Sequence, residues 1–156
     1  MRFPTSLTSP FRLASSFLRH PGPLKLLLAE ASVLLVFSRI LLIMLPFRRL
    51  VGLLNITCDP RRMDAAARER QRRQIGWAIG RAALHLPGQT VCFPRGITAQ
   101  IMCRRRGIDT TLYYGAKTLP DHGLTAHVWV LDGEVGVVGH EEAGLYNVLA
   151  TFPPPS

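Results

Sequence analysis

The sequence predicts an α+β fold, in which N-terminal helices precede a core made of one further helix and a small antiparallel sheet. Three observations point to this class. The first half of the chain carries apolar and Arg-rich helical patterns and no alternating strand pattern. Residues 110–117, 124–131 and 134–139 alternate or are rich in β-branched and aromatic residues, as strands are. The dipeptide Asp132-Gly133 between the last two segments is typical of a hairpin turn.

The composition indicates one folded domain with a basic surface. Hydrophobic residues make up 47% of the 156 residues, which excludes wholesale disorder. The chain has 19 Lys and Arg residues against 10 Asp and Glu, and its net charge of +9 favours an anionic partner such as nucleic acid, a membrane surface or an acidic peptide. The three cysteines include no CxxC pair, so we expect no disulfide framework and a reducing, cytoplasmic location.

The chain divides into three regions. Residues 1–23 are rich in Ser, Pro and Arg, and we expect a flexible basic arm that ends at a Pro-Gly-Pro sequence. Residues 24–88 are expected to form a helical N-terminal region. Residues 89–156, where the character of the sequence changes, are expected to form the core that carries the chemistry.

The most apolar stretch, residues 24–47, is expected to form a helix that does not span a membrane. Lys25, Glu30 and Arg39 interrupt it. A charge at the centre of a span costs about 2.5–3.5 kcal/mol even on a lenient scale. We therefore expect the helix to pack on the core or on a partner, and contact with a membrane surface is the alternative.

A second helix is predicted between Asp59-Pro60, a favourable N-cap and first position, and Pro87-Gly88. Its arginines favour either phosphate contact or a solvated face with i,i+4 ion pairs such as Glu69 with Arg73. We prefer the solvated face, because neither interleaved aromatic residues nor a nucleic-acid-binding motif accompanies the arginines. The arginines concerned are Arg61, Arg62, Arg68, Arg70, Arg72 and Arg73.

Cys92 and His127 are the candidate catalytic residues. Cys92 stands at the predicted start of a helix that ends near Gly107. The thiolate is the nucleophilic form of cysteine, a helix N-terminus favours it, and the free amides there can stabilise an oxyanion. His127 lies within a predicted strand, from which an imidazole can act as general base and then as general acid. The competing interpretation is a buried structural cysteine and an ordinary strand histidine.

The remaining cysteines and histidines indicate no metal site and no cofactor. Cys103 lies eleven residues after Cys92, about 16 Å along the same helix, so the two cannot share a metal or a disulfide. Cys103 is therefore expected to fill space in the core or at the surface. Cys58 has no evident partner, and the histidines lack the spacing of metal ligands. The histidines other than His127 are His20, His85, His122 and His140.

The segments VCFPRGITAQIMCRRRGIDTTLYYGAK, LTAHVWVLDGEVGVVG and YNVLATFP resemble the transglutaminase-like cysteine-protease core, and within it the leader peptidases of lasso-peptide biosynthesis. The resemblance covers roughly residues 24–153. It implies a transglutaminase-like or papain-like fold and cleavage of the leader from a ribosomally made precursor peptide by a Cys-His-Asp triad, without a cofactor. Cys92 matches the nucleophile and His127 the base. A separate leader-recognition protein and an asparagine-synthetase-like cyclase are the partners that it implies.

The sequence does not decide which residue is the third member of the triad. The family's residue type favours Asp132, which lies in the turn. If the hairpin pairs Leu131 with Glu134, His127 faces Val138, and Glu141 lies closer to the imidazole than Asp132 does. We expect Asp132 to serve mainly the turn, with Glu141 or a backbone carbonyl orienting His127.

A function of another class is a non-catalytic basic adaptor or a membrane-surface interaction protein, in which Cys92 is structural. Fast alkylation of Cys92 that depends on His127 separates the two functions, because only the enzyme requires the pair.

Overall fold

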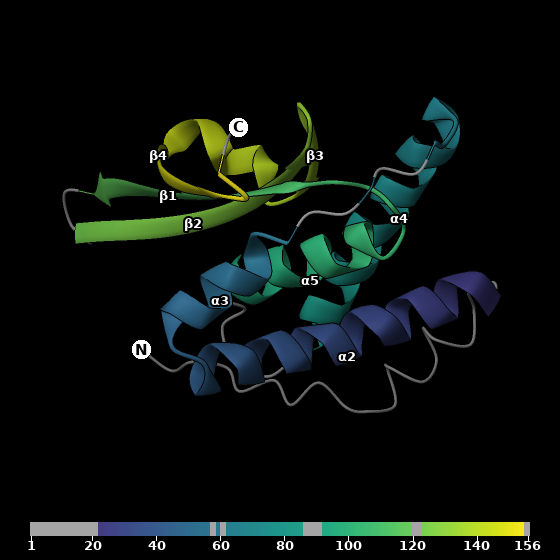
Figure 1. The fold of residues 1–156 in the computed structure, drawn as a ribbon, viewed down its shortest axis with the longest axis horizontal. Helices are drawn as coiled ribbons and strands as arrows, with labels where there is room; N and C mark the ends of the chain where they lie inside the picture. Colours follow the sequence, from purple (N-terminus) through teal and green to yellow (C-terminus); the bar gives the residue numbers. More distant parts are fainter. Residues whose placement is uncertain (1–21, 57–58, 60–61, 86–91, 120–122, 155–156) are drawn as a thin grey trace, which may run out of the picture.

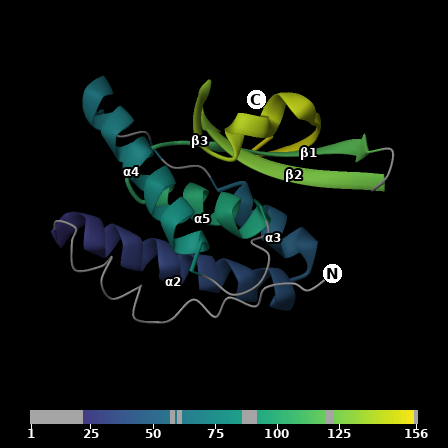
Figure 2. The same ribbon diagram turned by 180° about the vertical axis from the view of Figure 1, so that it is seen from behind.

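The structure is a computed structural model and describes residues 22–56, 59, 62–85, 92–119 and 123–154. It has two layers, a helical layer and a sheet, with a short helix on the far face of the sheet (Figure 1). The view from behind shows the same arrangement (Figure 2). The helices are α2 Gly22–Met44, α3 Phe47–Leu54, α4 Ala65–Ala83, α5 Cys92–Arg104 and the 3₁₀ helix η1 His140–Leu145. The strands are β1 Thr111–Leu119, β2 Gly123–Asp132, β3 Val135–Val138 and β4 Asn147–Phe152.

The expected α+β class is confirmed. The four strands are antiparallel in the order β3-β2-β1-β4, so the central strands are β2 and β1. The sequence predicted three of these strands and missed β4, which pairs with β1. Most of the predicted arm, residues 1–21, lies outside the described residues.

The core lies between the helices and one face of the sheet. Its buried cluster includes Ile75 and Ile79 of α4, Met102 and Cys103 of α5, and Val128 of β2. Cys103 is fully buried there, which confirms that it fills the core. Helices and strands share this one cluster, so the helical region and the sheet region bury their apolar surface together.

Two glycines allow the helices to approach the sheet. A Cβ on Gly96 of α5 would lie 2.7 Å from Val128 Cγ1, and a Cβ on Gly76 of α4 would lie 2.6 Å from the Val137 carbonyl oxygen. Both distances are too short for any larger residue without a shift of its neighbours. The glycines therefore fix how close α5 comes to β2 and α4 comes to β3.

The helix α2 buries one face and exposes another. Leu27, Ala31 and Leu35 are buried, and Ser38 Oγ lies 3.2 Å from Thr98 Oγ1 of α5. By length and composition α2 is long and apolar enough to cross a membrane, but the core helices of soluble proteins can meet the same criteria. Large apolar side chains are nevertheless exposed along its opposite face: Leu26, Val33, Val36, Phe37, Ile40, Ile43 and Met44.

The predicted hairpin exists, but its predicted register is wrong. Asp132 pairs with Val135 and Leu131 with Gly136, and a bulge then places Val130 opposite Val138. The turn contains Gly133 at a φ of 60°, and β3 ends at Val138, before it reaches the level of His127. The difference begins at the turn, which consists of Gly133 and Glu134 rather than Asp132 and Gly133, so that Asp132 is the last residue of β2. The bulge between Leu131 and Val130 then shifts the later pairs by one further residue. His127 pairs instead with Gly115 of β1.

Candidate functional site

Cys92 is the first residue of α5, where the sequence predicted a helix start. Its side chain is half-buried, and its thiol is free. The ring of Phe93 contacts that of Tyr114 at 5.8 Å, which holds the start of α5 against β1. The first turn contains no acidic residue, so the amides at this helix end are not neutralised by a local carboxylate.

His127 is half-buried in an aromatic cluster. Its ring stacks on Tyr146 at 5.0 Å and lies 6.0 Å from Trp129, which in turn stacks on Tyr113. The Lys117 ammonium lies 4.3 Å from the centre of the Tyr146 ring. The alternation of β2 predicts that Trp129 shares a face with His127, but the contribution of Tyr146 could not be read from the sequence.

The Gly139 carbonyl is the group that orients His127. Nε2 lies 2.7 Å from this oxygen, which only accepts, so Nε2 carries the proton. In the neutral ring Nδ1 is then the basic nitrogen. Gly139 has a φ of 69°, and a Cβ there would lie 2.7 Å from the Val128 carbonyl oxygen and 3.3 Å from Nε2. A glycine at this position therefore makes the contact with the ring possible.

The structure does not bring Cys92 and His127 together. Val128 packs on Gly96 of α5, and adjacent strand residues point to opposite faces. His127 thus lies on the sheet face that carries Tyr146 and η1, away from α5. Within the described part of the chain, no hydrogen bond joins the thiol to the imidazole.

Asp132 also lies apart from His127, and Arg68 and Arg72 of α4 hold it. Arg68 Nε and Nη2 donate to the two carboxylate oxygens at 2.8 and 2.5 Å, and Arg72 Nη1 donates at 2.7 Å. Burial by itself would raise the pKa of Asp132, but these hydrogen bonds outweigh it and the pKa lies below its usual value. The bond to Asp132 raises the pKa of Arg68. This carboxylate joins α4 to the hairpin, a role that goes beyond the expected one in the turn.

Glu141, the alternative third member, is exposed on η1. Its Oε2 lies 4.0 Å from Nδ1 of the neighbouring His140. The His140 ring occupies the space where a Cβ of Gly136 would lie. Neither Glu141 nor His140 orients His127. Asp132, Glu141 and a backbone carbonyl were the candidates for the group that orients His127. Of these, the backbone carbonyl is the one that contacts the imidazole.

The arginines of α4 follow the expected pattern only in part. Glu69 pairs with Arg73 at 2.6 Å, as the i,i+4 spacing predicted, and also with Arg72. The bonds from Arg72 and Arg73 lower the pKa of Glu69. Arg68 and Arg72 are not a solvated face, however, because both turn toward Asp132. Cys58 and His122 lie outside the described residues, and the described ones include no group of three or more potential metal ligands.

The family now follows from comparison. A family model described as the transglutaminase-like superfamily matches residues 35–151, which is well over half of the chain. The chain belongs to this superfamily. The matched stretch begins within α2, ends within β4 and includes Cys92 and His127. The comparisons with curated proteins and with solved structures give no match.

Proposed function

We propose that this protein is a cysteine endopeptidase that removes the leader from a ribosomally made precursor peptide during lasso-peptide maturation. The observation that carries the proposal is the position of Cys92, at the first residue of a helix inside a transglutaminase-like domain. The superfamily includes cysteine proteases. The segments around Cys92 and His127 supply the finer resemblance.

The proposed reaction has two steps. The Cys92 sulfur attacks the scissile carbonyl, its proton passes to His127 Nδ1, and first-turn amides of α5 stabilise the oxyanion. The imidazolium then protonates the leaving amine, which leaves a thioester on Cys92. Water, deprotonated by the same nitrogen, hydrolyses the thioester and releases the leader. No cofactor takes part.

This reaction requires an assembled state that differs from the described structure. The thiol and Nδ1 must come within hydrogen-bond distance, whereas the register of β2 directs His127 away from α5. The hydrogen bond from Nε2 to Gly139 is compatible with the reaction, because it leaves Nδ1 available. We propose that binding of the precursor brings the start of α5 and the imidazole together.

Thiol labelling tests the proposal. The full-length protein is treated with iodoacetamide near neutral pH with and without precursor, and modified cysteines are identified by mass spectrometry. Cys92 should react at least tenfold faster than Cys58, and His127→Ala should remove this difference. His85→Ala is the matched control, because it removes a histidine that follows α4 and lies outside the segments that resemble the family, and it should change nothing.

A second candidate, a non-catalytic adaptor, is favoured by the separation of Cys92 from His127 on the two faces of β2. In such a protein the thiol has ordinary reactivity and the aromatic cluster around His127 only stabilises the sheet. Labelling of Cys92 no faster than Cys58, with or without precursor, would support the adaptor.

The partners and the location follow from the proposed reaction. The substrate is the precursor peptide, and a separate leader-recognition protein and an asparagine-synthetase-like cyclase act beside the peptidase in the cytoplasm. The exposed apolar face of α2 is available for peripheral contact with a membrane. Nucleic acid is not a proposed partner, since two of the α4 arginines hold Asp132 and Arg73 holds Glu69.

A further inference from the structure

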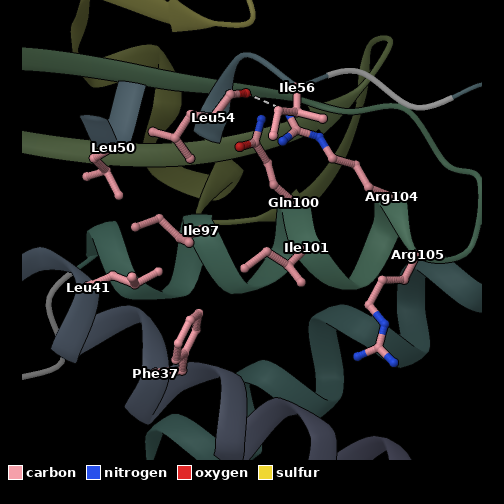
Figure 3. Close-up of a pocket in the computed structure, with 10 residues that line it drawn as sticks. All are labelled: Phe37, Leu41, Leu50, Leu54, Ile56, Ile97, Gln100, Ile101, Arg104 and Arg105. Atoms are coloured by element: carbon pink, nitrogen blue, oxygen red, sulfur yellow. Dashed lines mark hydrogen bonds between the residues drawn. The ribbon is translucent and has the colours of Figure 1, made fainter. Parts of the chain in front are cut away.

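An apolar pocket of about 340 Å³ lies between α2, α3 and α5 (Figure 3). Its volume falls within the range of small ligand-binding pockets, roughly 300–1,000 Å³. Three lining residues are polar and the others are aliphatic or aromatic. The lining residues are Phe37, Leu41, Leu50, Leu54, Ile56, Ile97, Gln100, Ile101, Arg104 and Arg105.

Gln100 places a buried hydrogen-bond acceptor in this apolar wall. Its side chain is fully buried, and Nε2 donates to the carbonyls of Thr110 at 3.2 Å and Phe152 at 2.7 Å. Two carbonyl acceptors require the NH₂ group on that side, which fixes the orientation of the amide. Oε1 accepts no hydrogen bond. Figure 3 shows the amide rising from α5 beside Leu54. A ligand that fills the pocket therefore gains by donating to Oε1.

The edge of the pocket carries a net positive charge. Arg105 is 64% exposed and pairs with Glu30 of α2 at 3.1 Å. The same carboxylate also accepts a bond from Arg106 at 2.6 Å, so one acid serves two guanidinium groups. Arg104, which donates to the Leu54 carbonyl at 2.6 Å, adds a second positive charge to the lining beside Arg105. An acidic group on the ligand is favoured at this edge.

We propose that this pocket binds a Trp or Tyr side chain of a peptide segment that carries an acidic residue next to the aromatic one. The ring fills the apolar space, its N–H or O–H donates to Gln100 Oε1, and the carboxylate lies near Arg105. A lipid chain matches the apolar lining equally well but leaves Oε1 without a donor.

The pocket lies close to Cys92 along α5. Ile97, the first α5 residue in the lining, follows Cys92 by five residues, about 7.5 Å along the helix axis. A peptide anchored in the pocket reaches the thiol within a few extended residues. Only this use as a substrate anchor rests on the proposed peptidase function, because binding of the peptide itself does not require catalysis.

Peptide titration tests the pocket in the full-length Cys92→Ala protein, in which loss of catalysis cannot affect the result. The probes are acetyl-Glu-Trp-Glu-amide and acetyl-Glu-Phe-Glu-amide, followed by calorimetry and by NMR of the isoleucine methyl groups. The Trp peptide should bind at least fivefold more tightly than the Phe peptide and should shift the methyl signals of Ile97 and Ile101. Equal affinities, or no shift at these methyl groups, would overturn the proposal.

Two variants locate the binding. Ile101→Phe narrows the pocket and should weaken binding of the Trp peptide at least tenfold. Val33→Phe, on the exposed face of α2, should leave the affinity unchanged. Arg105→Glu should weaken it at least threefold, with the exposed Arg70→Glu as the charge-matched control. If Ile101→Phe fails to fold by circular dichroism, the Arg105 pair alone decides. Binding to phosphatidylglycerol vesicles that displaces the peptide, or that occurs in its place, would assign the pocket to lipid instead.

Discussion

Arg68 holds Asp132 through two hydrogen bonds, Nε to Oδ2 at 2.8 Å and Nη2 to Oδ1 at 2.5 Å, across 64 residues of sequence. Arg72, one turn further along α4, adds a third bond to the same carboxylate. Asp132 is 6% exposed, so the pairing takes place where water screens little. This contact fixes the hairpin against α4. It gives Asp132 a structural role in place of the triad role that the family resemblance implied.

Asp132→Asn should therefore lower the stability of the fold. The substitution leaves two guanidinium groups facing a neutral amide, and a broken buried pair costs about 3–5 kcal/mol. Because about a third of the Arg68 side chain is exposed to water, we expect a smaller effect. The free energy of unfolding measured in urea should fall by about 2 kcal/mol. Glu141→Ala, at an exposed position, should change stability by less than about 0.5 kcal/mol. Equal effects of the two variants would contradict this role of Asp132.

Stability should fall in acid, and Asp132 should account for much of the fall. Its pKa is lower in the folded state than in the unfolded state, so the unfolded chain binds more protons in this range. The stabilisation is present above the unfolded value of about 3.9 and is lost as pH falls through the lower folded value. Unfolding free energies measured from pH 6 to 3 should decline less steeply in Asp132→Asn. The control variant is Glu69→Gln, which removes an exposed acid of α4 whose pKa is also lowered. Its unfolding free energies are measured over the same pH range.

Two glycines of α4 should respond oppositely to alanine. A Cβ on Gly76 would lie 2.6 Å from the backbone oxygen of Val137, which cannot move without shifting β3. Gly76→Ala should cost about 1–3 kcal/mol. Gly80, on the same helix, has open space around its Cα, and Gly80→Ala should stabilise by about 0.5–1 kcal/mol. Thermal unfolding checks both. A neutral or stabilising Gly76→Ala would mean that α4 does not approach β3 this closely.

The helix α2 should attach the protein to membrane surfaces without spanning the bilayer. Leu27, Ala31 and Leu35 are buried against the rest of the fold, and the charge of Glu30 is paired with Arg105 and Arg106. Insertion would break these contacts and bury charges in lipid. Alkaline carbonate should release the protein from membranes of expressing cells, and retention in the pellet would show that α2 spans them.

Local chemistry made much of the fold predictable. The α5 helix begins at Cys92 as predicted, and Asp132-Gly133 marks the hairpin, because start and turn signals depend on a few adjacent residues. The register could not be predicted, since the turn lies one residue later than the Asp132-Gly133 dipeptide indicated and the bulge between Leu131 and Val130 has no local signal. β4 was missed for a related reason: its exposed Val148 and Leu149 are adjacent and break the alternation that marks a half-buried strand.

The site was predictable as a set of residues but not as an arrangement. Cys92 and His127 stand out by residue type and context, but their sides of the sheet depend on which face of β2 meets α5. That choice is made by Gly96 and Val128, through a contact between distant segments. The partner of Asp132 is equally distant in sequence. Sequence reasoning therefore identified candidates whose contacts only the tertiary structure supplies.

The rate of leader cleavage by the Cys92→Ala variant tests most directly the central claim, that Cys92 is the nucleophile. The full-length protein and the variant are incubated with the precursor peptide and its leader-recognition protein, and the released leader is quantified by mass spectrometry. Alanine removes the sulfur with little change in volume, so circular dichroism should show the same fold. Without its nucleophile the enzyme should lose on the order of 10⁴-fold or more in rate. A folded variant that cleaves within about tenfold of the unmodified protein would contradict the assignment of Cys92 as the nucleophile.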